Sequence, residues 1–278
     1  MSSSDHVDAT QRWRLDLAYD GQAFNGFAYQ PHRDTVVGLL RLTLARTLRL
    51  EHEPVIVGAG RTDAGVHAFH QVVHVDLPRA AKVRSLEGGR LCDSLNKQLR
   101  GRVQILSAMP VENDFHARFS ATWREYRYLV LEHNAPGLES TNAWAWSVKG
   151  PLDLAAMNRV ASSLVGTHDF RAFCRRPSNG AVGEPLYRRI HAVHWERLDD
   201  TWVMSPRETP AVRLTIRAQS FCHNMVRCLV SSMVAVGSGT LAEEEIDRRL
   251  ESGDRHQLPQ PAPAAGLALV GVGYDALS

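Results

Sequence analysis

Residues 58–65, "GAGRTDAG", place one carboxylate in a glycine-rich segment between two apolar runs. Asp63 stands directly before Ala64-Gly65, and Arg61 stands two residues earlier. An Asp in such a segment commonly bonds to backbone two residues further on, and taken alone the pattern favours this turn role. The alternative is a catalytic carboxylate, because a nearby arginine keeps it ionised and the glycines let a ligand approach closely.

A second candidate is Arg227, the only Lys, Arg, Asp or Glu in the apolar segment 221–236. An unpaired guanidinium inside a buried helix costs several kcal/mol. Arg227 must therefore extend its charged end to solvent or face a carboxylate. On an ordinary helix the first solution is the common one. The second would pair it with Asp63 and hold that carboxylate negative and fixed in direction.

The segment "TWREYRYL" supplies aromatic rings beside guanidinium groups. Strand alternation places Tyr126 and Tyr128 on one face, with Arg124 and Arg127 as their neighbours. An aromatic ring flanked by guanidinium groups suits stacking on a nucleobase and binding of phosphate. The alternative is a half-buried strand with one solvated side.

Other chemistries lack their usual patterns. His67, His70 and His74 match neither HExxH nor a Cys/His zinc pattern, so we interpret them as ordinary strand histidines. The sequence contains no P-loop, no strand followed by GxGxxG and no GxSxG. The cysteines have no short paired spacing and are expected to be reduced thiols: Cys92, Cys174, Cys222 and Cys228.

The composition of the 278 residues, 44% hydrophobic and 22% charged, is typical of a soluble globular protein. No apolar run is long enough to span a membrane. The first residues are polar and contain no apolar signal core, so we expect a cytoplasmic protein with a disordered tail over residues 1–11.

The charge is unevenly distributed, although the formal net charge is only +2. Residues 165–190 contain five arginines but only two acids, whereas acids gather near residues 243–254. A basic face that binds phosphate would produce this excess. A bias in genome composition toward arginine would also produce it, and composition alone does not separate the two. The arginines are Arg171, Arg175, Arg176, Arg188 and Arg189.

The elements that must position these residues follow from periodicity and breakers. Strands are predicted over residues 12–20, 54–60, 68–78, 101–110, 123–132, 188–198, 211–219 and 264–275. Helices are predicted over residues 35–50, 85–99, 151–166 and 220–237, and a loop over 174–187. This order indicates an α+β fold of two similar halves. We expect an N-terminal subdomain over residues 12–110 that carries the Asp63 loop, and a C-terminal subdomain over 111–278.

Seven segments together resemble one family, tRNA pseudouridine synthase A, in family order from residue 13 to residue 275. Each matches a family block: "YDGQAFNGF", "GRTDAGVHAFHQVVHVD", "DSLNKQL", "DFHARFSATWREYRYLV", "GTHDFRAF", "SFCHNMVRCLVSSMVAVG" and "APAAGLALVGVGY".

The resemblance implies isomerisation of uridine to pseudouridine at positions 38, 39 and 40 of the tRNA anticodon stem-loop. It implies that Asp63 is the catalytic carboxylate, that Tyr126 packs on the target base and that Arg227 pairs with Asp63. Arg61 then helps to hold the flipped nucleotide or its phosphate. Whether Asp63 acts as a nucleophile or as a base stays open.

The resemblance also implies one central, mostly antiparallel sheet, made where the sheets of the two halves join. Helices pack on this sheet, the active-site cleft lies between the halves, and a homodimer binds tRNA. The reaction involves neither redox change nor phosphoryl transfer, so we expect no cofactor and no metal. Two rivals remain. The first is a non-catalytic RNA-binding protein on the same scaffold. The second is a base-releasing glycosidase or nuclease, which would generally need a second carboxylate.

Overall fold

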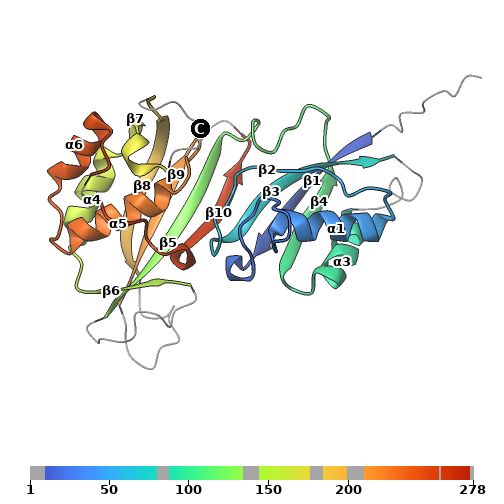
Figure 1. The fold of residues 1–278 in the computed structure, drawn as a ribbon, viewed down its shortest axis with the longest axis horizontal. Helices are drawn as coiled ribbons and strands as arrows, with labels where there is room; N and C mark the ends of the chain where they lie inside the picture. Colours follow the sequence, from blue (N-terminus) through green and yellow to red (C-terminus); the bar gives the residue numbers. More distant parts are fainter. Residues whose placement is uncertain are drawn as a thin grey trace, which may run out of the picture. The chain divides into compact units, whose positions relative to one another are not determined.

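The computed structural model describes residues 10–79, 88–133, 144–175, 184–198, 210–256 and 258–275. Within these residues there are ten strands and five α-helices, so the predicted α+β class is confirmed (Figure 1). The chain divides into two compact units, Met1–Thr122 with Val272–Ser278, and Trp123–Gly271. The first unit therefore continues past the boundary that we expected near residue 110 and includes the end of the chain.

The sheet of the first unit has β1 at its centre. β1 is antiparallel to β3 on one side and to β4 on the other, and β2 is antiparallel to β3. The strands are β1 (Thr10–Tyr19), β2 (Ile56–Gly58), β3 (His67–Pro78) and β4 (Val103–Pro110). Residues 1–9 of the expected tail lie outside the described residues. Thr10 and Gln11 belong to β1, so an eleven-residue tail was too long.

Among the described residues of the first unit, two α-helices lie against each other, α1 (Val36–Leu48) and α3 (Gly88–Leu99). The alternation of β1 buries Leu15 and Leu17 completely, as the period-2 pattern predicts. α1 buries Leu40 and Leu44 in the same way, one helical turn apart. These apolar side chains belong to the buried core of the first unit.

The sheet of the second unit is also mostly antiparallel. β5 pairs with β9, β9 with β8 and β8 with β7, whereas β6 is parallel to β5. The strands are β5 (Trp123–His133), β6 (Trp146–Lys149), β7 (Gly166–Asp169), β8 (Tyr187–Leu198), β9 (Ala211–Ala218) and β10 (Leu267–Gly273), whose last two residues belong to the first unit.

The helices of the second unit are α4 (Leu154–Ser163), α5 (Met225–Gly237) and α6 (Glu244–Ser252). α4 packs on α5 and on β8. Trp195 of β8 is almost wholly buried, and its ring N–H donates to the Met233 sulfur of α5 at 3.2 Å. No helix among the described residues combines the length and hydropathy that a membrane span needs.

The structure differs from the predicted elements at several places. β6, β7 and α6 were not predicted. α5 begins at Met225 and not near residue 220, because Asn224 adopts the left-handed conformation with φ 64°. Residues 176–183 of the predicted loop lie outside the described residues.

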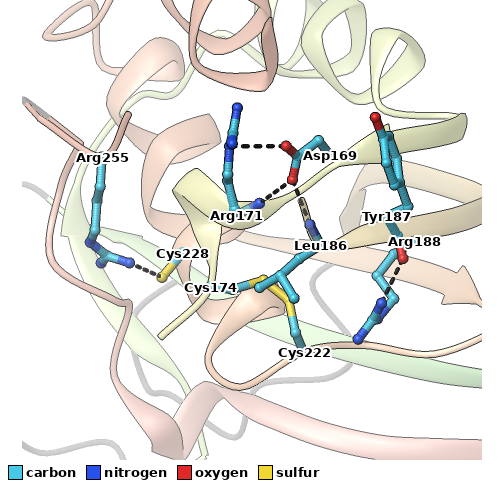
Figure 2. The surroundings of a disulfide bond; sticks show 9 residues. All are labelled: Asp169, Arg171, Cys174, Leu186, Tyr187, Arg188, Cys222, Cys228 and Arg255. Atoms are coloured by element: carbon cyan, nitrogen blue, oxygen red, sulfur yellow. Dashed lines mark hydrogen bonds and ion pairs between the residues drawn. A yellow bond between two sulfur atoms is a disulfide. The ribbon is translucent and has the colours of Figure 1, made fainter. Parts of the chain in front are cut away.

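The prediction of four reduced cysteines was wrong for two of them. Cys174 and Cys222 form a disulfide with their Cα atoms 5.8 Å apart (Figure 2). Cys92 and Cys228 are not part of a disulfide. The separation of Cys174 and Cys222 by 48 residues gave no short-range signal. The bond joins the segment after β7 to the segment that leads into α5.

Candidate active site

Asp63 lies in a tight turn between β2 and β3 of the first unit. Its carbonyl accepts from the Val66 N–H at 3.1 Å, and Gly65 at the third position has φ +81°. A turn of this type requires positive φ there, which explains the glycine. The turn interpretation of the sequence is thus correct for the backbone, and it leaves the Asp63 carboxylate half-buried beside the exposed Arg61.

Buried neighbours hold this turn in place. The Thr62 hydroxyl is 2.8 Å from the Tyr19 hydroxyl, and the Gln71 amide donates to the Gly60 carbonyl at 3.0 Å. Burial raises the pKa of Tyr19 to about 12, so its hydroxyl stays protonated at neutral pH. Gly60 and Thr62, which both precede Asp63, are therefore anchored to β3 and β1.

The segment after β1 packs closely against the same turn. A Cβ on Gly21 would lie 2.0 Å from the Val66 carbonyl oxygen, so no larger residue fits. Gly26 has φ +105°, and a Cβ there would lie 3.3 Å from the Thr62 carbonyl oxygen. The glycines of "YDGQAFNGF" thus have a physical reason, which is the close approach of two backbone segments that position Asp63.

Tyr126 lies on β5 in the second unit, opposite Ile216 of β9. Its side chain is 7% exposed, and the Phe221 ring meets it edge-on with centroids 5.2 Å apart. Phe221 is a residue that sequence reasoning did not single out, although it belongs to a quoted motif. It fixes the orientation of the Tyr126 ring.

The other members of "TWREYRYL" have separate roles. Tyr128 shares the buried face with Tyr126, as predicted, and its hydroxyl donates to the Pro263 carbonyl at 2.8 Å. Burial raises the pKa of Tyr128. Arg124 lies on this same face and donates to the Gln219 carbonyl at 2.7 Å, whereas Arg127 is exposed on the other face. Only one of the two arginines therefore shares the face of the tyrosines.

Arg227 lies in the first turn of α5 and is half-buried. Its Nε donates to the Ala262 carbonyl at 2.7 Å, and one terminal nitrogen lies 3.4 Å from Asn224 Oδ1. In return the Ala262 N–H donates to the Arg227 carbonyl at 3.0 Å. These bonds fix the guanidinium to the segment before β10, so its direction is set within the second unit.

The structure thus groups the four predicted site residues by unit. Arg61 and Asp63 share one turn of the first unit, and Tyr126 and Arg227 belong to the second. Pairing of Arg227 with Asp63 stays a prediction. Chemically, the first pair offers a carboxylate beside an exposed cation, and the second an aromatic ring and an oriented guanidinium.

The three strand histidines bond to protein groups. His67 Nδ1 accepts from the Gly21 N–H at 3.2 Å, His70 Nε2 is 3.0 Å from Asp16, and His74 Nδ1 accepts from the Ala117 N–H at 3.0 Å. Burial lowers the pKa of His74 to about 4, so the ring is neutral near pH 7. Across the described ranges, no group of three or more His, Cys, Asp or Glu side chains is arranged to hold a metal ion.

Comparison with known proteins identifies relatives along most of the chain. The family model described as tRNA pseudouridine synthase matches residues 17–120 and 160–275. The tRNA pseudouridine synthase A of Cutibacterium acnes is 41% identical over 263 residues, which cover 95% of this chain and 88% of the relative. That of Jannaschia sp. is 39% identical over 266 residues, covering 95% of each chain. That of Frankia casuarinae is 40% identical over 270 residues, covering 96% of this chain and 91% of the relative.

Proposed function

The chain belongs to the tRNA pseudouridine synthase family, and we propose that it converts uridine to pseudouridine at positions 38, 39 and 40 of the tRNA anticodon stem-loop. The enzyme is an isomerase. The N1–C1′ bond of the nucleoside breaks and a C5–C1′ bond forms. The hydrogen of C5 leaves as a proton and N1 takes up a proton, so the product is an isomer of the substrate. The observation that carries the proposal is the Asp63 turn, which presents a half-buried carboxylate from a segment that the family model matches.

We assign the central role to the Asp63 carboxylate. In one route it attacks the sugar or the base as a nucleophile, and in the other it removes a sugar proton as a base. Both routes need the ionised carboxylate, because a protonated acid has no free electron pair of comparable basicity. The anchored turn supports both, since it limits the motion of the backbone that carries Asp63.

Tyr126, Arg227 and Arg61 would position the target nucleotide and the Asp63 carboxylate. A base within a stem must be extruded, at a cost of a few kcal/mol. Stacking on Tyr126 would offset roughly 1–3 kcal/mol of that cost. Arg227 would favour the ionised form of Asp63, and Arg61 would hold the flipped nucleotide or its phosphate.

Three further properties belong to this proposal. We propose that the enzyme works as a homodimer, in the cytoplasm, and with neither metal nor cofactor. Support comes from the family resemblance and from a reaction that transfers neither electrons nor a phosphoryl group. Light scattering with size-exclusion chromatography tests the dimer, and unchanged turnover in excess chelator tests the independence from metal.

The deciding experiment uses tRNA labelled with tritium at uridine C5. Tritium release without strand cleavage and without free uracil supports isomerisation. Free uracil would indicate a glycosidase, and tRNA binding without any tritium release would indicate the non-catalytic RNA-binding protein.

The variant Asp63→Asn tests the residue assignment. The amide keeps the size of the side chain but removes its charge, so we expect the rate of tritium release to fall by about 10⁴-fold or more. The affinity for tRNA should stay within a fewfold of the unchanged protein. Asp93→Asn is the control, because Asp93 lies on α3 outside the candidate site, and it should release tritium at the normal rate. Substantial turnover by Asp63→Asn would reject this carboxylate.

A further inference from the structure

A cavity of about 610 Å³ lies in the second unit beside the start of α5. Three arginines from two separate segments line it, together with polar side chains. Figure 2 shows Arg171 near the disulfide and Arg255 beside Cys228 of α5. The lining includes Arg171, Arg175, Arg255, Asn224, Gln260 and Cys174.

One of the three arginines is neutralised by the protein. Arg171 Nε is 2.9 Å from the Asp169 carboxylate, and a terminal nitrogen donates to the Ser252 carbonyl at 3.3 Å. A Cβ on Gly253 would lie 1.7 Å from Arg171 Nε, so the guanidinium packs directly on this glycine. Arg171 therefore forms a fixed wall of the cavity.

The other two arginines retain their charge within the cavity. Arg255 is half-buried, and one of its terminal nitrogens donates to the Cys228 sulfur at 3.3 Å. Arg175 is exposed, but its backbone N–H donates to the His223 carbonyl at 2.9 Å. In the described ranges neither of them forms an ion pair with a carboxylate. A guanidinium carries five N–H donors, so each has donors left for an anion.

The disulfide stabilises this arrangement. Cys174 directly precedes Arg175, and Cys222 directly precedes His223, whose carbonyl binds the Arg175 backbone. The covalent bond and the hydrogen bond therefore fix the backbone of Arg175, which lines the cavity. Because this backbone is already fixed, binding of an anion has to order only the side chain of Arg175.

We propose that this cavity binds a phosphodiester group of the tRNA backbone through Arg175 and Arg255. Planar guanidinium groups match the oxygens of phosphate, and the start of α5 adds partial positive charge. The inference rests on the proposed function, which supplies RNA as the phosphate source. Asn224 lines the cavity and also accepts from Arg227, so the bound phosphate lies beside a residue of the candidate active site.

The test measures equilibrium binding of tRNA across a series of salt concentrations. Each phosphate contact contributes a salt-dependent increment to affinity. We expect Arg175→Gln and Arg255→Gln each to weaken tRNA binding about three- to tenfold near 0.1 M salt. The salt slope is the slope of the logarithm of the association constant against the logarithm of the salt concentration, and each variant should reduce its magnitude by about one. The rate of tritium release at saturating tRNA should stay within about twofold.

Arg159→Gln is the matched control. Arg159 lies in the same unit but pairs with Glu243 at 2.7 Å, so its removal should leave the salt slope unchanged. Thermal unfolding checks that each variant is folded. Because Arg255 is half-buried, Arg255→Lys serves as a second variant, which keeps the charge and should retain most of the slope.

The outcomes separate this inference from the proposed function. Tritium release by the unchanged protein, together with normal salt slopes for Arg175→Gln and Arg255→Gln, would overturn the phosphate site alone. Absence of tritium release would overturn the function instead. The alternative is that the cavity binds a small phosphate compound and not RNA. Calorimetric titration with inorganic pyrophosphate tests this alternative. Tight pyrophosphate binding that both variants abolish, with unaltered tRNA slopes, would assign the cavity to a small phosphate compound and refute the RNA contact.

Discussion

Substitutions of Tyr126 test whether tRNA binding and turnover need its aromatic ring alone or also its hydroxyl. Tyr126→Phe keeps the ring and its edge-on contact with Phe221, so we expect it to retain stacking and much of the tRNA affinity. Tyr126→Ala removes the ring and should weaken tRNA binding by roughly 1–3 kcal/mol. Fluorescence titration with tRNA and tritium release measure the two effects.

The matched control for this pair is Tyr128→Phe. Tyr128 is fully buried on the same strand, and its hydroxyl donates to the Pro263 carbonyl. Its loss should lower the free energy of unfolding by about 1 kcal/mol and leave tRNA affinity unchanged. If Tyr126→Phe proved as inactive as Tyr126→Ala, the Tyr126 hydroxyl would have a role beyond stacking.

His74 gives the fold a pH dependence in mild acid. Burial lowers its pKa in the folded protein to about 4, from an ordinary value of 6.5, with smaller contributions from Arg12 and His116. The unfolded chain therefore binds a proton between these two values that the folded protein does not bind. This contribution to stability is complete above pH 6.5 and is lost as the pH falls toward 4, at no more than about 1.4 kcal/mol per pH unit.

His74→Gln isolates this effect. A glutamine oxygen can still accept from the Ala117 N–H, but it does not titrate. Urea unfolding between pH 7 and pH 4 should show a shallower loss of stability for the variant than for the unchanged protein. Parallel curves would show that His74 is protonated equally in both states.

At the scale of elements, the periodicity of apolar residues predicted the strands and helices whose apolar side chains are buried. β1 and α1 were predicted because their apolar residues must face one core, and Leu15, Leu17, Leu40 and Leu44 do so. α6 was missed because its nine residues are mostly charged, and the only apolar residues that it buries are Ile246 and Leu250, beside the buried Glu245. β6 and β7 are four residues each, too short for a pattern to stand out. β6 and β7 depend on pairing with β5 and β8, and a short sequence window around either strand does not contain its partner.

The disulfide is likewise an element-scale contact that spacing did not predict. Closing a loop with a sequence separation of 48 residues restricts the unfolded chain and stabilises a protein by up to about 4 kcal/mol in the chain-entropy description. We expect Cys174→Ser, or a reducing agent, to lower the midpoint of urea unfolding. Alkylation under denaturing, non-reducing conditions, followed by mass spectrometry, should label two cysteines, because Cys228 is buried in the folded protein.

Cys92→Ser is the control for this prediction. Cys92 is a free thiol on α3 in the other unit, and its loss should shift the midpoint little. A reducing agent should also have no further effect on Cys174→Ser. Labelling of all four cysteines under denaturing, non-reducing conditions would contradict the bond and restore the original expectation of reduced thiols.

At the scale of the whole molecule, the residues from Val272 onward belong to the first unit, although the second unit precedes them in the sequence. The expected boundary near residue 110 followed the change in element order, but the first unit continues to Thr122 and includes residues from Val272 onward. The Thr122 N–H donates to the Gly273 carbonyl at 2.9 Å, which joins the two segments. Such a return depends on contacts between residues about 150 positions apart in the chain, and no local pattern encodes it.

Tyr274 is the side chain that anchors this return. Its hydroxyl donates to the Ala117 carbonyl at 2.9 Å, and the Arg14 guanidinium lies 4.8 Å from its ring centroid. Tyr274→Phe should lower the free energy of unfolding by about 1 kcal/mol through the lost hydrogen bond. Tyr274→Ala should lower it by about 2–3 kcal/mol, because it also removes the half-buried ring.

Tyr187→Ala is the control, since Tyr187 is 61% exposed and its loss should cost no more than about 0.5 kcal/mol. Urea unfolding measures all three variants, and equal losses for Tyr274→Ala and Tyr187→Ala would show that the end of the chain does not stabilise the first unit.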